Sequence, residues 1–125
     1  DMLKKSSSSV RVYYPRFNKQ EVIERGSKGL EELGRKLPLV LVILFGSYAK
    51  GNYTVASDID LLVIYDGKER DDAYAMVKRA LSIPNLEPHV YTRAQFEQMK
   101  GTIEAMVRDG IILFGEKPCW LRPVR

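Results

Sequence analysis

The chain has 125 residues, of which 45% are hydrophobic and 29% charged, and its formal net charge is +4. These values indicate one ordinary globular domain with a modest core. No apolar stretch reaches the roughly 18–20 residues of a membrane span, so no membrane is expected as a partner. No long run of like charge marks a nucleic-acid surface, so nucleic acid is not expected as a partner either. Cys119 is the only cysteine, which excludes an internal disulfide, and a cytoplasmic location is expected.

The N-terminal third predicts a tail followed by a helix. Residues 1–9 are polar and are expected to be a flexible tail, leaving residues 10–125 as a single domain. A short strand or extended arm is expected at residues 10–14. Asn18 and Glu21 fit a helix N-cap with its glutamate partner, and Pro38 is expected to close that helix. The apolar stripe of the helix consists of Val22, Gly26, Leu30, Leu33 and Leu37.

Two continuous hydrophobic runs, residues 39–45 and 58–65, then predict strands that are buried on both faces. A second helix is expected over residues 71–82. A third strand over residues 86–91 contains a proline, which indicates a sheet edge or a strand end.

The C-terminal part predicts one further helix. Thr92 and Gln95 repeat the capping pattern, and a helical stripe runs from Phe96 to Val107, with Gly110 as the expected residue just past the helix end. Residues 111–114 are a last strand or an apolar tail docked on the sheet. The order of elements predicts an α/β domain, a sheet covered by helices.

Asp58 and Asp60 stand at the start of the second buried run. Side chains alternate along a strand, so both carboxylates project to one face, roughly 6.5–7 Å apart along the backbone. They repel each other unless a cation lies between them, and a hard divalent cation is the natural occupant. The alternative, that they merely cap the strand, is disfavoured because carboxylates beside a buried apolar run are costly without a cation.

Gly46 and Ser47 end the first buried run. A glycine lets the backbone approach a phosphate closely, and the serine adds a hydroxyl and an N–H at the start of a helical turn. In isolation the pair would fit an ordinary turn. Lys50 could reach the same phosphate charge, or it could face solvent.

Gly46-Ser47, ten intervening residues and then Asp58-Ile59-Asp60 together resemble the motif of the DNA polymerase β-like nucleotidyltransferase superfamily. The similarity is greatest to its stand-alone minimal nucleotidyltransferases. The resemblance implies a small mixed β-sheet flanked by helices. It also implies that Gly46 and Ser47 hold the β- and γ-phosphates of ATP, and that Asp58 and Asp60 bind Mg²⁺, with two ions expected when nucleotide is bound.

The family normally places a third carboxylate on the next strand. Glu87, His89 and Tyr91 share one face of the expected third strand. Glu87 is the only carboxylate there, so we assign it the third catalytic and metal-binding position. His89 occupies the position where many relatives place the aspartate; it could act as a general base or be a polar residue at the sheet edge.

The predicted activity is transfer of a nucleoside monophosphate, AMP from ATP, to a hydroxyl of a macromolecule. The resemblance implies a small helical HEPN-domain protein as partner, and an antitoxin that adenylylates a tyrosine of that HEPN toxin. The alternative is a module that keeps the fold but neutralises or senses its partner by binding alone. A third, nucleic-acid binding, is suggested only by the mildly basic charge and the N-terminal arm. An exposed edge near residues 86–91 would permit a homo-oligomer.

Overall fold

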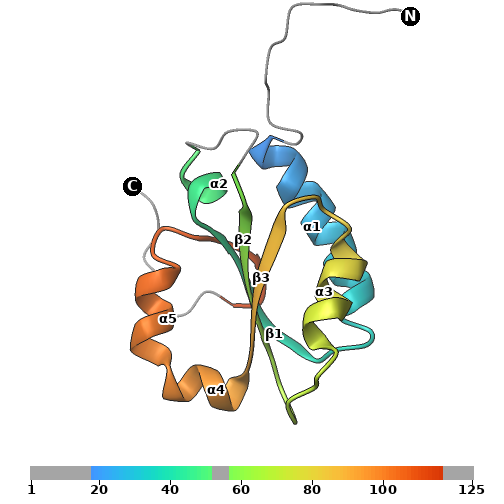
Figure 1. The fold of residues 1–125 in the computed structure, drawn as a ribbon, viewed down its shortest axis with the longest axis vertical. Helices are drawn as coiled ribbons and strands as arrows, with labels where there is room; N and C mark the ends of the chain where they lie inside the picture. The colour runs from blue at the N-terminus through green and yellow to red at the C-terminus, as the bar shows by residue number, and fades with distance from the viewer. Residues whose placement is uncertain (1–17, 52–56, 117–125) are drawn as a thin grey trace, which may run out of the picture.

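The computed structural model describes residues 18–51 and 57–116 (Figure 1). The predicted tail at residues 1–9 and the expected arm at residues 10–14 lie outside the described residues.

A four-stranded mixed sheet forms the centre of the fold. Its strands lie in the order β3-β2-β1-β4, with β1 antiparallel to both β2 and β4, and β2 parallel to β3. The bounds are β1 Leu39–Phe45, β2 Ile59–Tyr65, β3 Leu86–Thr92 and β4 Ile111–Phe114. The predicted strands are therefore present, and β3 lies at the edge of this sheet, as its proline indicated.

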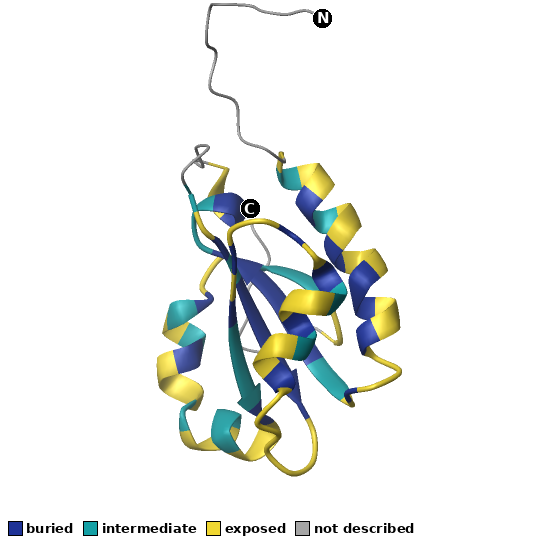
Figure 2. Cartoon of the chain, turned by 45° about the vertical axis from the view of Figure 1, so that its right-hand side comes forward, coloured by how far each residue is buried: buried dark blue, intermediate teal, exposed yellow. Residues whose placement is uncertain are grey.

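Helices cover both faces of the sheet (Figures 1 and 2). One face packs against α1 (Lys19–Leu33) and α3 (Ala73–Leu81), and the other packs against α5 (Lys100–Met106), with α4 (Arg93–Gln98) leading into it. The short helix α2 (Ser47–Lys50) follows β1 directly. This double cover explains why the two central strands are hydrophobic without interruption. Among the described residues, no helix is both long and apolar enough to cross a bilayer.

The α1 capping box is present as predicted. The Asn18 side chain accepts from the Glu21 N–H at 2.8 Å, and the Glu21 carboxylate accepts from the Asn18 N–H at 2.9 Å. The helix ends at Leu33, earlier than the expected stop at Pro38. Leu37 is nonetheless buried, because the turn after the helix continues with a bond from the Leu37 N–H to the Leu33 carbonyl at 2.9 Å.

The predicted C-terminal helix is divided in two. Its capping box at Thr92 and Gln95 is present, but the backbone leaves helical geometry at Met99, with φ −110° and ψ 20°. Gly110 is not the residue that reverses the chain past the helix end, since Asp109 takes the left-handed conformation with φ 66°. Gly110 is required for space instead, because a Cβ there would collide with the side chain of Ile43.

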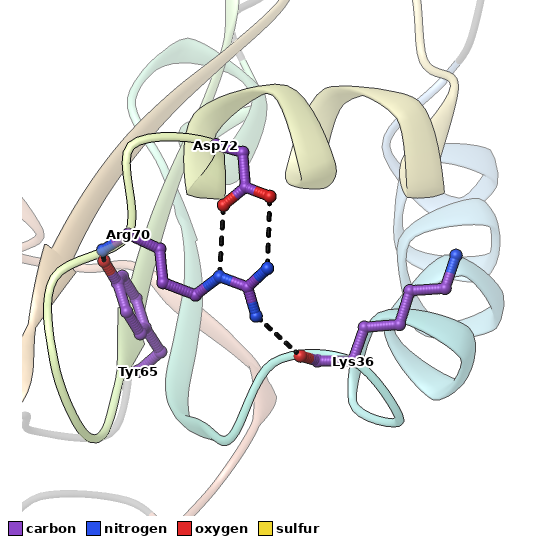
Figure 3. A network of polar contacts seen from close by, with 4 residues as sticks. All are labelled: Lys36, Tyr65, Arg70 and Asp72. Atoms are coloured by element: carbon purple, nitrogen blue, oxygen red, sulfur yellow. Dashed lines mark hydrogen bonds and ion pairs between the residues drawn. The ribbon is translucent and has the colours of Figure 1, made fainter.

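The loop between β2 and α3 is tied to the end of α1 by Arg70 (Figure 3). Its guanidinium donates to both carboxylate oxygens of Asp72 at 3.1 Å and to the Lys36 carbonyl at 3.4 Å, while its backbone N–H donates to the Tyr65 hydroxyl at 2.8 Å. The hydrogen bond from Arg70 holds the pKa of Asp72 below its usual value, and the same bond raises the pKa of Arg70. This network lies at the end of β2, away from the residues at its start.

Candidate functional site

The end of β1 and the start of β2 lie side by side because these strands are antiparallel, with Phe45 opposite Asp60. Gly46 follows β1 with φ 79° and ψ −152°, a backbone conformation that is essentially restricted to glycine. A Cβ on Gly46 would lie 2.5 Å from Oδ2 of Asp60. The structure therefore brings Gly46 and Asp60 into direct proximity, so that a group held by the backbone at Gly46 would lie beside the carboxylate.

Helix α2 presents Ser47 and Lys50 next to Gly46. The helix is anchored by Tyr48 and Ala49, which are buried in the core on the α1 side of the sheet. Ser47 is half-buried, and its hydroxyl has no hydrogen-bond partner within the part of the chain that the structure describes. Lys50 is exposed in the same helical turn. Both side chains are thus available to a ligand at the end of β1.

The two aspartates project away from the α1 and α3 core, as the alternation predicted. Ile59 lies between them and is buried on that core side at 2% exposure. Asp58 directly precedes β2 and is exposed, while the side chain of Asp60 is 29% exposed. The strand therefore presents both carboxylates at one end of the sheet, on the same face as the α5 core.

Strand β3 adds two polar residues to the same face. In the parallel register Glu87 is opposite Asp60, and His89 is opposite Leu62. Glu87 is exposed and makes no hydrogen bond or ion pair with any described residue. His89 reaches back along the strand instead, with its Nε2 3.4 Å from Oδ1 of Asp60. Sequence alternation placed both residues on this face but could not show which of them contacts the aspartate.

The donor set fits a hard divalent cation. Such ions take carboxylate oxygens, and Mg²⁺ retains water and completes its shell with substrate phosphates. Asp58 and Asp60 supply carboxylates at this end of the sheet, and the Gly46 backbone lies directly beside Asp60. Among residues 18–51 and 57–116, no three acidic, histidine or cysteine side chains converge in a preformed metal cage. The two aspartates fit an ion that would take the rest of its shell from water and phosphate oxygens.

The fold gathers Gly46, Ser47, Asp58 and Asp60 at one end of the sheet. The profile of the nucleotidyltransferase domain family matches residues 27–113, a range that contains Gly46, Ser47, Asp58, Asp60 and Glu87. The chain belongs to this family of nucleotidyltransferase domains.

A curated relative matches over a short segment. The chain is 64% identical over 25 residues to a Methanocaldococcus jannaschii protein named "putative protein adenylyltransferase MJ0604". The matched segment spans 20% of this chain and a quarter of the relative.

Solved structures share the fold. A "putative nucleotidyltransferase" from Sulfolobus solfataricus superposes with a TM-score of 0.56 at 22% identity, over 78% of this chain and 84% of that one. The toxin–antitoxin complex MntA–HpeT contains a chain with a TM-score of 0.52 at 21% identity, over 73% and 74% of the two chains. A toxin–antitoxin structure with AMP-PNP has a TM-score of 0.50 at 23% identity, with the same coverage.

Proposed function

We propose that this chain is a divalent-cation-dependent nucleotidyltransferase that transfers AMP from ATP to a hydroxyl of a protein, with Mg²⁺ as the ion implied by the family resemblance. The observation that carries the proposal is the close approach of Gly46 to the Asp60 carboxylate. This proximity supports a site in which the Gly46 backbone would contact a phosphate while Asp60 binds the cation, at one end of the sheet.

In this reaction the acceptor oxygen attacks the α-phosphorus of ATP, the bond to the β-phosphate breaks, and pyrophosphate leaves. Gly46 and Ser47 would hold the β- and γ-phosphates, and Lys50 would balance part of their charge. Asp58 and Asp60 would bind the cation, which neutralises charge on the phosphates and aligns the attacking and leaving oxygens. Glu87, exposed on the adjacent strand, would take the proton of the acceptor hydroxyl and contribute to cation binding.

The acceptor is proposed to be a tyrosine of a HEPN-domain toxin, which makes this chain an antitoxin. Support comes from the resemblance of the motif, from the name of the short curated match and from fold-level likeness to toxin–antitoxin structures.

The test is incubation of the protein with ATP labelled at the α-phosphate and a divalent cation, with and without a HEPN protein encoded beside it. Wild type should transfer label to that protein, and the Asp58→Ala/Asp60→Ala double variant should not. Asp71→Ala is the matched control, because Asp71 is also an exposed aspartate but lies beyond the far end of β2. It should transfer label at the wild-type rate.

A binding-only antitoxin predicts a different result. In that case the double variant would still neutralise the toxin, and no label would move in any sample. The exposed, uncontacted state of Glu87 motivates this second candidate. Neutralisation of toxin ribonuclease activity, measured beside label transfer, separates the two.

A further inference from the structure

The carboxylate of Asp60 has two different neighbours. Its Oδ2 faces the position where Gly46 lacks a side chain, and its Oδ1 lies 3.4 Å from Nε2 of His89. The imidazole is held in place from the side, because its ring centroid lies 5.2 Å from that of Phe45, at an interplanar angle of 52°. Both polar side chains are about equally accessible, 30% for His89 and 29% for Asp60. Nε2 of His89 and Oδ1 of Asp60 thus face each other, and both side chains are partly exposed to solvent.

We propose that His89 is a metal ligand of this site, paired with Asp60, and that it shifts the preferred ion from Mg²⁺ to a first-row transition metal such as Mn²⁺. This inference rests on the proposed nucleotidyltransferase function and specifies the ion that the function uses. Oδ1 of Asp60 and Nε2 of His89 are 3.4 Å apart, which is close enough for both atoms to bind one ion. Two metal–ligand bonds of about 2.1 Å each can span that separation.

The chemistry of the donors sets the preference. Mg²⁺ takes oxygen ligands almost exclusively, whereas imidazole nitrogen binds divalent transition metals well. Replacing an expected carboxylate by a histidine removes one negative charge and one hard oxygen from the site. That change weakens Mg²⁺ more than Mn²⁺. Asp58 and the nucleotide phosphates would complete the shell around the pair.

Glu87 is the competing residue on the same face, and the structure favours His89. Glu87 is opposite Asp60 in the register but points into solvent and makes no polar contact with a described residue. His89 is two residues further along β3, and its side chain is directed back so that the ring nitrogen lies 3.4 Å from the carboxylate. The edge position of β3 leaves both accessible to a nucleotide-bound ion.

The first experiment uses wild-type protein without a histidine tag. His89 is the only histidine in the chain, so its two ring nitrogens give unambiguous NMR signals in ¹⁵N-labelled protein. With ¹¹³Cd²⁺ as the probe, a scalar coupling to Nε2 appears only if a bond joins metal and nitrogen. We expect that coupling at Nε2 and none at Nδ1. A spectrum of the cadmium-saturated protein in which Nε2 shows neither a coupling nor a change of chemical shift overturns the proposal, and no variant has to fold for this result.

The second experiment measures the affinities of the protein for Mn²⁺ and for Mg²⁺ by calorimetry, in the presence of a non-hydrolysable ATP analogue. His89→Asp should reduce the ratio of Mn²⁺ to Mg²⁺ affinity by about tenfold or more, because even outer-shell changes alter metal affinity by about 10–100-fold. Glu97→Gln, which changes an exposed glutamate on α4, is the matched control and should leave that ratio as in wild type. If Glu87→Gln changes the ratio and His89→Asp does not, Glu87 is the third ligand and the inference is wrong. If the protein transfers label with Mg²⁺ but shows no binding of cadmium to His89, this inference is wrong and the proposed function stands. If no label is transferred with any ion, the proposed function is wrong.

Discussion

Adding one methyl group to Gly46 should disrupt both the stability of the chain and its proposed chemistry. The backbone at φ 79° and ψ −152° is nearly closed to residues with a Cβ, and forcing one into it costs about 1–3 kcal/mol. The new Cβ would also lie 2.5 Å from Oδ2 of Asp60, where contacts below 3.0 Å essentially do not occur. The carboxylate must therefore retreat by at least about 0.5 Å, the difference between those two distances.

Displacement of Asp60 by that amount should slow AMP transfer on the order of 10–100-fold, since a misplacement of about 1 Å can cost 10²-fold in rate. Stability is measured by urea unfolding monitored by circular dichroism, and transfer by the α-labelled ATP assay. Gly67→Ala is the matched control. Gly67 also has a positive φ, 92°, but nothing lies within 4 Å of its added Cβ. Gly67→Ala should be destabilised by backbone strain to a similar extent, and it should keep the wild-type transfer rate.

A double-mutant cycle separates the two causes of the Gly46→Ala effect. In an Asp60→Ala background the carboxylate is gone, so the added methyl group retains its backbone strain but loses its collision partner. Gly46→Ala should therefore destabilise wild type by at least about 0.5 kcal/mol more than it destabilises the Asp60→Ala protein. Equal losses in the two backgrounds would refute the reasoning that Asp60 abuts Gly46.

Three further substitutions test the packing and the polar contacts. Gly29→Ala should cost about 1–3 kcal/mol by urea unfolding, because its Cβ would lie 2.8 Å from a backbone carbonyl of α3, whereas Gly26→Ala meets only a leucine side-chain end at 3.2 Å and should cost less. Thr92→Ala should cost about 1–2 kcal/mol, since Thr92 is buried and caps α4; a loss below 0.3 kcal/mol in the same assay would contradict that role. Asp72→Asn removes a carboxylate whose pKa is lowered by Arg70, so its contribution is present above the unfolded-state pKa near 4 and is lost as pH falls through the lower folded-state value. The variant should lose less stability than wild type between pH 5 and pH 2 in thermal unfolding, and 1 M salt should shrink the difference, because the pair is exposed.

Local patterns predicted most of the fold. The capping box at Asn18 and Glu21 is an interaction among neighbours, and it forms as the sequence indicated. The hydrophobic runs of β1 and β2 reflect burial on both faces, so their positions could be identified without knowing their partners. The helix break at Met99 was not predicted, because the apolar stripe continues across it and Gly101, two residues later, is by itself tolerated within a helix. Such a break depends on how the helix fits the sheet, which is a property of the whole fold.

The site shows the same division between local and distant information. Gly46, Ser47, Asp58 and Asp60 lie at the end of β1 and the start of β2, so their proximity follows from a single antiparallel pairing. The contact of Gly46 with Asp60 itself was missed, because the glycine was interpreted as making room for a phosphate alone. The strand register explains this contact. Phe45, the last residue of β1, pairs with Asp60, so the next residue, Gly46, lies beside the Asp60 carboxylate.

The third group of the site depends on the register between β2 and β3. The Asn85 carbonyl accepts from the Ile59 N–H at 2.8 Å, so alternate residues along β3 direct their backbone groups toward β2, and Pro88 falls on the outward side. Pro88, which has no N–H to donate, thus excludes a slip by one residue. It cannot exclude a slip by two, which would put His89 in place of Glu87 opposite Asp60. In the observed register Asp60 is opposite Glu87, and the histidine ring still reaches the aspartate from two residues further along β3. In the proposed site, whether Glu87 or His89 lies nearest the aspartate therefore depends on strand pairing and not on the motif.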